Sequence, residues 1–153
     1  MLTKGQDTDS VLFVLSGWLS LSKCLPDGEI QIIDFASPGD IIETGGTGGS
    51  VSAVSIEALT NVKVAVIHAP TWQASKRDRP DLGRVARTIP AATRARLAER
   101  VLRLGRAQMR MPYALLELHV RLDAIGQSKA GRFRLPLTQR VLGNFVDLSS
   151  VHV

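Results

Sequence analysis

The chain lacks several features that would define its class at once. It has one cysteine, Cys24, so it cannot close an internal disulfide, and one thiol falls short of the roughly four ligands of an iron–sulfur cluster. The expected role of this cysteine is that of a small buried apolar residue. No apolar run approaches the roughly 20 residues that cross a bilayer, and the first ten residues lack the layout of a secretion signal. We therefore expect a cytoplasmic protein with no membrane partner.

Acidic residues are scarce in the second half of the chain. Residues 1–81 contain six Lys and Arg against ten Asp and Glu, a balance of −4, whereas residues 82–153 contain thirteen against four, a balance of +9. The net charge of +5 therefore hides a division between an acidic and a basic half. A basic half indicates a polyanionic partner, although a solvated surface explains many runs of charge equally well.

The first part of the chain predicts short strands separated by turns. Residues 11–23 are β-branched and apolar, and Leu19 and Leu21 alternate with Trp18 and two serines. Turns are predicted at 25–29 and 37–40, a strand at 30–36, and two further strands within 55–67 on either side of Thr60 and Asn61. Short strands with a turn about every ten residues indicate a β-roll, barrel or sandwich.

From Pro70 the pattern becomes helical, and the segment 91–109 carries two apolar stripes. Leu97, Val101 and Leu104 form one stripe, and Ala98, Leu102, Gly105 and Met109 form the other. One stripe would cover the strands and the other would meet the same helix of a second copy, with dimer contacts at Leu97, Val101, Leu104 and Gln108. The alternative is a helix buried within one monomer.

A further helix is predicted to begin at Pro112 and to occupy residues 113–125. Its buried side would consist of Leu115, Leu116, Leu118 and Leu122. The polar, glycine-bearing residues 126–132 predict a loop, and residues 133–137 predict a short extended piece.

The last residues, 137–153, predict two short helices joined by a tight turn. Thr138 is a plausible N-cap for a helix whose apolar positions are Val141, Leu142, Phe145 and Val146. A break at residues 147–149 is followed at once by Val151 and Val153. The outline is that of a helix-turn-helix, with an ordinary pair of packed helices as the alternative.

The order of these parts resembles the Crp/Fnr family of bacterial transcription regulators. The run LSGWLSLSKCLPDGEIQIIDFASPGD is similar to the family's β-roll, EALTNVKVAVI to its closing strands, RLAERVLRLGR to its dimerisation helix, and LPLTQRVLGNFVDLSSVHV to its DNA-binding motif. The resemblance implies an α+β fold: a double-stranded β-helix of the cyclic nucleotide-binding kind at residues 1–87, a dimerisation helix at 88–111 and a partial winged helix-turn-helix at 112–153.

The same resemblance implies a function and a set of partners. It predicts a homodimeric transcription regulator that binds double-stranded DNA when the full DNA-binding motif is present, and that meets RNA polymerase. Family members begin with a helix and a strand that would precede Met1, and they continue beyond Val153 through a recognition helix and a winged hairpin. The resemblance therefore implies a chain that is cut at both ends.

The helix-turn-helix would carry the DNA-binding residues. In such motifs the first helix positions phosphates and the start of the second helix meets base edges in the major groove. The resemblance places Thr138 and Gln139 in the first role, and Ser149, Ser150, Val151 and His152 in the second. Asp147 replaces a glycine that many members have in the turn, a tolerable change because Asp accepts left-handed geometry better than most residues.

The family's cyclic nucleotide cassette uses a glutamate for the ribose and an arginine for the phosphate. Here the expected arginine aligns with Ser52, and no arginine precedes Arg77, so the bidentate clamp is missing. Glu43 is displaced by about one position from the expected glutamate. The candidate effector pocket comprises Glu43, Thr44, Gly45, Gly46, Ser52 and Ser55. We expect no cyclic AMP binding and either a different small-molecule effector or none.

Two other classes of function fit the sequence less well. A cupin-like enzyme needs several His and Glu residues around a metal, and the strand region contains a single histidine, His68, so we expect no catalysis and no metal. The three histidines, His68, His119 and His152, are too scattered to predict a haem site, and we expect no cofactor. A β-roll sensor or protein-interaction module that does not bind DNA remains the alternative to a regulator.

Overall fold

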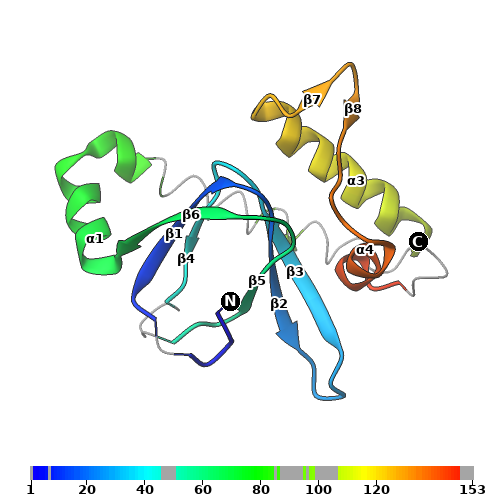
Figure 1. Ribbon diagram of the computed structural model, residues 1–153, viewed down its shortest axis with the longest axis horizontal. Helices are drawn as coiled ribbons and strands as arrows, with labels where there is room; N and C mark the ends of the chain where they lie inside the picture. The colour runs from blue at the N-terminus through cyan, green and yellow to red at the C-terminus, as the bar shows by residue number, and fades with distance from the viewer. Residues whose placement is uncertain are drawn as a thin grey trace.

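The computed structural model describes residues 2–6, 8–45, 51–84, 86, 95, 97–98 and 107–148. Within these residues, antiparallel strands form a β-roll, a short helix flanks one end of it, and two helices with a small hairpin cover its other side (Figure 1). The predicted α+β class with a β-roll is confirmed. No helix in this part of the chain has the length and apolar character that a membrane span requires.

Two three-stranded sheets make up the roll. Their orders are β4-β1-β6 and β3-β2-β5, and every pairing within them is antiparallel. The strands are β1 (Ser10–Ser16), β2 (Leu19–Cys24), β3 (Ile30–Ala36), β4 (Ile41–Glu43), β5 (Ser55–Ala58) and β6 (Lys63–His68). The turns predicted between β2 and β3 and between β3 and β4 are present, and Gly28 and Gly39 take positive φ angles in them.

The apolar run at residues 11–23 is two strands rather than one. Gly17, with φ of 81°, ends β1, and the chain passes there from one sheet to the other. A Cβ atom at Gly17 would lie 2.3 Å from the carbonyl oxygen of Asn61, so no larger residue fits without a shift of the backbone. The Oγ1 atom of Thr60 accepts a hydrogen bond from the Trp18 N–H at 2.9 Å, which fixes the crossing.

Both faces of β2 and β3 are buried, which simple alternation did not predict. Leu19 and Ala36 point into the roll, where they join Val14, Ile42 and Ile56 in one apolar cluster, here called the roll core. Trp18, Ile32 and Phe35 lie on the other side, under the C-terminal helices. Cys24, at the end of β2, is exposed, so the expectation of a buried thiol is wrong: the strand runs beyond the covering helices there.

Helix α1 (Ala69–Asp78) follows β6 directly, as the pattern from Pro70 predicted. Pro70 lies in its first turn, where a missing N–H costs nothing. Trp72 is buried and packs edge-to-face on Phe13 of β1, with ring centroids 5.2 Å apart. Residues 80–84 are also helical.

Helix α3 (Ala107–Ala124) contains Pro112 in its interior, so the prediction that a helix begins at this proline is wrong. The predicted buried face is also partly wrong. Leu118 and Leu122 are buried, but Leu116 is 59% exposed and Leu115 is not buried either. The buried positions are Ala114, Leu118 and Leu122, at steps of four, and the apolar Leu115–Leu116 pair masked that register in the sequence.

The segment predicted as a loop at residues 126–132 contains a small hairpin. Strands β7 (Ser128–Lys129) and β8 (Arg132–Phe133) pair across Ala130 and Gly131, whose φ angles of 49° and 73° are both positive. Two positive φ angles in a two-residue connection define the turn that suits the twist of a hairpin. An extended piece then leads to α4 (Gln139–Val146).

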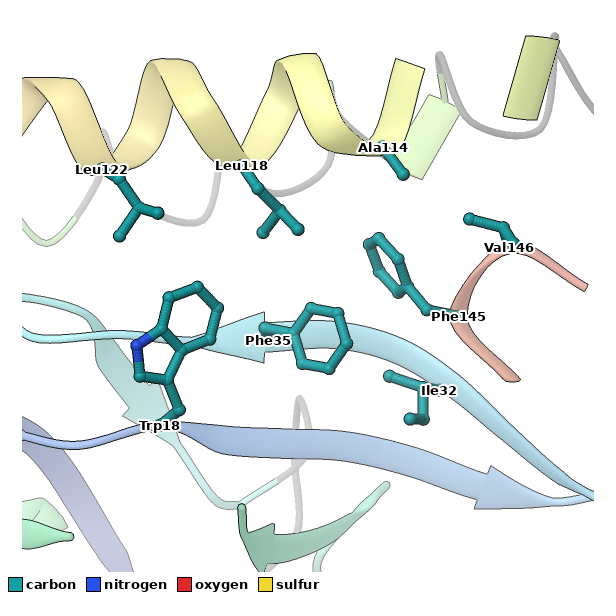
Figure 2. Close-up of a cluster of buried hydrophobic side chains, with 8 residues drawn as sticks. All are labelled: Trp18, Ile32, Phe35, Ala114, Leu118, Leu122, Phe145 and Val146. Carbon is teal, nitrogen blue, oxygen red and sulfur yellow. The ribbon is translucent and has the colours of Figure 1, made fainter. Parts of the chain in front are cut away.

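A second apolar cluster joins the C-terminal helices to the roll and is here called the interdomain core. Figure 2 shows α3 lying above β2 and β3, with Leu118 and Leu122 pointing towards Trp18 and Phe35. The Phe35 and Phe145 rings lie 4.5 Å apart, centroid to centroid. Its buried members are Trp18, Ile32, Phe35, Ala114, Leu118, Leu122, Phe145 and Val146. The C-terminal half is therefore packed on the roll.

Candidate functional site: a nucleic-acid interface and an effector pocket

Helix α4 is defined at both ends by the residues that the sequence singled out. The Thr138 Oγ1 atom accepts a hydrogen bond from the Val141 N–H at 3.3 Å, so the predicted N-cap is confirmed. Asp147 ends the helix with φ of 56° and ψ of 52°, the left-handed geometry predicted for it. Its backbone N–H donates to the Gly143 carbonyl, and the Leu148 N–H donates to the same oxygen at 3.1 Å.

The start of α4 faces solvent while its far side is buried. Thr138, Gln139 and Arg140 are exposed, and Phe145 and Val146 are inside the interdomain core. The two predicted phosphate-contacting residues are therefore accessible at the N-terminus of a helix, where backbone N–H groups and the helix dipole favour an anion. The predicted base-reading residues, Ser149, Ser150, Val151 and His152, lie outside the described residues.

The segment that leads into α4 is basic and holds no acid. Residues 126–146 contain four basic residues and neither Asp nor Glu. All four are exposed: Lys129, Arg132, Arg134 and Arg140. The charge balance of the sequence predicted a basic second half but not the position of these residues on this hairpin and helix.

Arg110 supports the turn at the end of α4. Its Nη1 atom donates to the Asp147 carbonyl oxygen at 2.8 Å and reaches the Asp147 Oδ2 atom at 3.1 Å. The turn is thereby tied to the first part of α3, within the C-terminal half.

The candidate effector residues lie around the end of β4, but their polar groups are already engaged. The Glu43 Oε1 atom accepts from the Trp72 Nε1–H at 3.0 Å and from Lys76 Nζ at 3.5 Å, so this carboxylate is bound to α1. Thr44 is buried and donates to the Ser10 carbonyl oxygen at 2.6 Å.

The polar groups of the two candidate serines, Ser52 and Ser55, are engaged in the same way. Ser52 is 2% exposed, forms a bridge with Gly45, and donates through Oγ to the Val54 carbonyl oxygen at 2.6 Å. Ser55 accepts from the Lys4 backbone N–H at 3.1 Å. Gly46 lies outside the described residues. The position that the resemblance aligns with the family's arginine is therefore a small buried hydroxyl bonded to a backbone carbonyl two residues later.

A cavity of about 400 Å³ opens beside this pocket, inside the roll. Its lining is mostly apolar, with three hydroxyl residues and no charged side chain: Leu2, Thr8, Ser10, Leu12, Leu19, Thr44, Ile56, Ala58, Val62, Val64 and Val66. A lining of this kind offers no counter-charge to a phosphate.

Only some of the predicted dimer contacts lie among the described residues. Leu97 is partly buried and Gln108 is exposed on the first turn of α3, while Val101 and Leu104 lie outside the described residues. Among the described residues, no three His, Cys, Asp or Glu side chains gather as a metal site would require. His68 ends β6 and pairs with Asp9 at 3.1 Å, and His119 stacks on Phe133.

A buried ionic cluster, which was not predicted from the sequence, lies between the two halves. Arg121 of α3 reaches Asp34 of β3 and Asp40 of the following turn, both at 3.0 Å. The available signal was a charged residue at a core position, because Arg121 lies three residues after Leu118 and next to Leu122 on the buried side of α3.

Comparisons with known proteins agree with this architecture. Residues 1–75 match the cyclic nucleotide-binding domain family. The chain is 28% identical over 143 residues to the transcriptional regulatory protein Btr of Bordetella pertussis and 27% identical over 146 residues to the nitrogen fixation regulation protein FixK of Azorhizobium caulinodans. These alignments cover 92% and 94% of this chain but 59% and 58% of those proteins, so the chain spans less than two thirds of their length.

Solved structures show the same fold. FixK2 from Bradyrhizobium japonicum superposes with a TM-score of 0.84 at 23% identity, covering 99% of this chain and 74% of that one. A CRP-family transcriptional regulator from Thermus thermophilus superposes with a TM-score of 0.72 at 19% identity, covering 99% of this chain and 74% of that one. The shared fold is a cyclic nucleotide-binding β-roll with helices packed on it. The chain is similar to these curated transcription regulators and shares the fold of solved CRP-family structures, so the predicted resemblance to Crp/Fnr-type regulators is confirmed.

Proposed function

We propose that this chain is the sensing domain and part of the DNA-binding domain of a homodimeric transcription regulator. The part of the DNA-binding domain formed by α3, the hairpin and α4 is here called the reading head. The proposal is carried by one observation: the start of α4, capped by Thr138, faces solvent and lies within the basic, acid-free segment 126–146. Residues 1–87 would sense, 88–111 would dimerise through Leu97, Val101, Leu104 and Gln108, and 112–153 would bind DNA. RNA polymerase is the expected protein partner.

Within the reading head, different residues would bind the DNA phosphates and the base edges. Thr138, Gln139, Arg134 and Arg140 would hold phosphates, which positions the motif without reading sequence. The residues after Asp147 would meet base edges in the major groove. Two heads of a dimer would then meet half-sites about one helical turn, roughly 34 Å, apart.

Fluorescence anisotropy with a palindromic duplex, selected from a random pool, tests this proposal. Binding should be strong only when the full reading head is present, and its affinity should fall steeply with salt, because phosphate contacts release counterions. The double variant Arg134→Gln/Arg140→Gln should weaken binding to every duplex and reduce the salt slope by about 0.9 for each lost phosphate contact.

A matched control separates local contacts from net charge. Lys23→Gln/Lys63→Gln removes the same charge from exposed positions on the roll and should leave the salt slope unchanged. Equal losses in both double variants would contradict the proposed interface. Self-association without binding to any duplex at low salt would favour the alternative, a β-roll sensor or protein-interaction module.

We infer that the roll does not bind cyclic AMP. The support is the absence of arginine before Arg77, the engagement of Glu43 with α1, and the apolar lining of the roll cavity. Calorimetric titration with cyclic AMP and with cyclic GMP should show no saturable heat, and binding at micromolar concentration would overturn this point.

A further inference from the structure

One arginine joins the C-terminal helices to the effector half. The Arg121 Nη1 atom donates to Asp34 Oδ1 at 3.0 Å, and its Nη2 atom donates to the Phe35 carbonyl oxygen at 2.7 Å and to Asp40 Oδ2 at 3.0 Å. The Arg121 side chain is 14% exposed. A single planar group therefore bonds three acceptors on β3 and the turn after it, across the boundary between the halves.

The charges around this guanidinium hold it in its ionised form. Burial alone would lower the pKa of Arg121, but the negative charges of Asp34, Asp40 and Glu117 outweigh burial, so the pKa is raised. Glu117, one turn earlier on α3, lies 3.9 Å away and is itself buried. Among the described residues, Arg121 lies beside three carboxylates, and its loss would remove a buried positive charge from next to them.

The turn held by Arg121 is continuous with the candidate effector pocket. Asp40 Oδ2, which receives Arg121, also accepts from the Ser37 N–H at 2.7 Å and from the Ser37 hydroxyl at 3.0 Å. Strand β4 starts at the next residue and ends at Glu43, just before Thr44. A strand of three residues spans about 10 Å, so the pocket and the ionic cluster occupy the two ends of one short rigid element.

We propose that Arg121 is a positioning residue that sets the orientation of the α3–α4 reading head relative to the roll, and that β4 transmits the state of the effector pocket to it through Asp40. The proposal rests on the proposed function in one respect: the element that Arg121 positions is taken to be the DNA-reading element. Apolar contacts in the interdomain core resist separation but are non-directional, whereas a guanidinium with three fixed acceptors also defines direction.

Pulsed electron paramagnetic resonance can measure the orientation without DNA. One spin label goes on the native Cys24 of the roll and the other on Lys129→Cys of the hairpin, both exposed positions. Labelled protein is mixed with excess unlabelled protein, so that any dimer holds at most one labelled copy. The parent should give one narrow distance distribution, and Arg121→Met should give a broader or shifted one.

Two further variants distinguish positioning from mere stabilisation. Arg121→Lys keeps the charge, but an ammonium is a point charge and cannot reproduce the planar set of donors of a guanidinium. The distance distribution of Arg121→Lys should therefore be broad, as in Arg121→Met. Arg110→Lys, a control within the C-terminal half, should leave the distribution narrow. If Arg121→Met or Arg121→Lys lowers the unfolding temperature but keeps the narrow parental distribution, the cluster is structural only and the proposal fails.

The coupling through β4 has its own test. Thr44→Val removes the buried hydroxyl that donates to Ser10 while keeping the shape of the side chain, and it should shift the distribution in the parent background. In the Arg121→Lys background the same change should add nothing. No shift in the parent, or equal shifts in both backgrounds, would overturn the coupling. Because no duplex is present, failure here leaves the DNA-binding proposal intact, and failure to bind DNA leaves this measurement valid.

Discussion

The roll core and the interdomain core differ in what they are made of and in what they hold together. The roll core consists of small and aliphatic residues such as Val14, Ala36 and Ile56, which close two sheets on each other. The interdomain core contains the aromatic residues Trp18, Phe35 and Phe145 beside the aliphatic face of α3. The larger side chains lie between the halves, so much of the apolar burial depends on the docking of the C-terminal helices.

The strands β2 and β3 belong to both clusters at once. Leu19 and Ala36 serve the roll core, while Trp18 and Phe35, one residue away from each, serve the interdomain core. Disorder in one cluster therefore disturbs the strands that build the other. We infer that the two halves unfold as one cooperative unit rather than as separate domains on a linker.

The largest effect should come from Phe145→Ala, which removes an aromatic ring from the interdomain core. We expect a loss of about 3–5 kcal/mol in the free energy of unfolding, the usual cost of such a cavity. The chain has two tryptophans, Trp18 in the interdomain core and Trp72 beside the roll, so Trp72→Phe and Trp18→Phe backgrounds report each region separately. Both fluorescence signals should move together in urea titrations.

A matched change in the roll core completes that experiment. Ile56→Val should cost about 0.5–1.5 kcal/mol and should also shift both signals equally. Separate transitions, with Phe145→Ala moving only the Trp18 signal, would contradict the single cooperative unit and make the halves independent.

The next effect should come from Gly17→Ala, at the crossing between the two sheets. The left-handed φ of 81° and the contact with the Asn61 carbonyl both oppose a Cβ atom, so we expect a loss of about 1–3 kcal/mol by thermal unfolding. Gly28→Ala is the control, since its φ is also positive but nothing lies within 4 Å of the added atom. If the two variants lose equal stability, backbone strain alone explains the cost and the close approach to Asn61 contributes nothing.

Local signals in the sequence predicted much of the roll and the ends of α4. Alternation and turn residues gave the strands, the Thr138 cap and the left-handed Asp147, because these features depend on residues close in sequence. The burial of both faces of β2 and the true face of α3 could not be predicted in this way. Each depends on which surface lies against the other half, which is a property of the tertiary packing.

The candidate site likewise combines local features that the sequence predicted with long-range contacts that it did not. The exposed start of α4 could be predicted from the helix-turn-helix pattern. The role of Arg121 could not, because its three acceptors lie more than eighty residues earlier in the chain. The engagement of Glu43 by Trp72 is equally non-local. In the sequence, the only sign of such a long-range polar contact is a charged residue at a position where the pattern predicts a buried one.

A smaller effect, confined to the C-terminal side of the comparison, should follow from Thr138→Ala. Loss of the N-cap should cost about 1 kcal/mol in the free energy of unfolding, and Thr138→Ser, which keeps the hydroxyl, should cost less. Urea titration of the three proteins measures the difference. An alanine variant as stable as the parent would show that the bond to the Val141 N–H contributes nothing.

The smallest effect should come from Asp147→Asn, which tests whether the turn needs charge or only left-handed geometry. Asparagine also tolerates positive φ, so the helix end should remain intact. Asp147 is 65% exposed on its side chain, and an ion pair as open as that with Arg110 adds at most about 1 kcal/mol. The Arg110 bond to the backbone carbonyl of residue 147 survives the change, so we expect a loss below about 0.5 kcal/mol in urea titrations. A loss several times larger would mean that the carboxylate itself holds the turn between α4 and the residues that follow, and the left-handed geometry of the backbone would then be a consequence of the ion pair rather than its support.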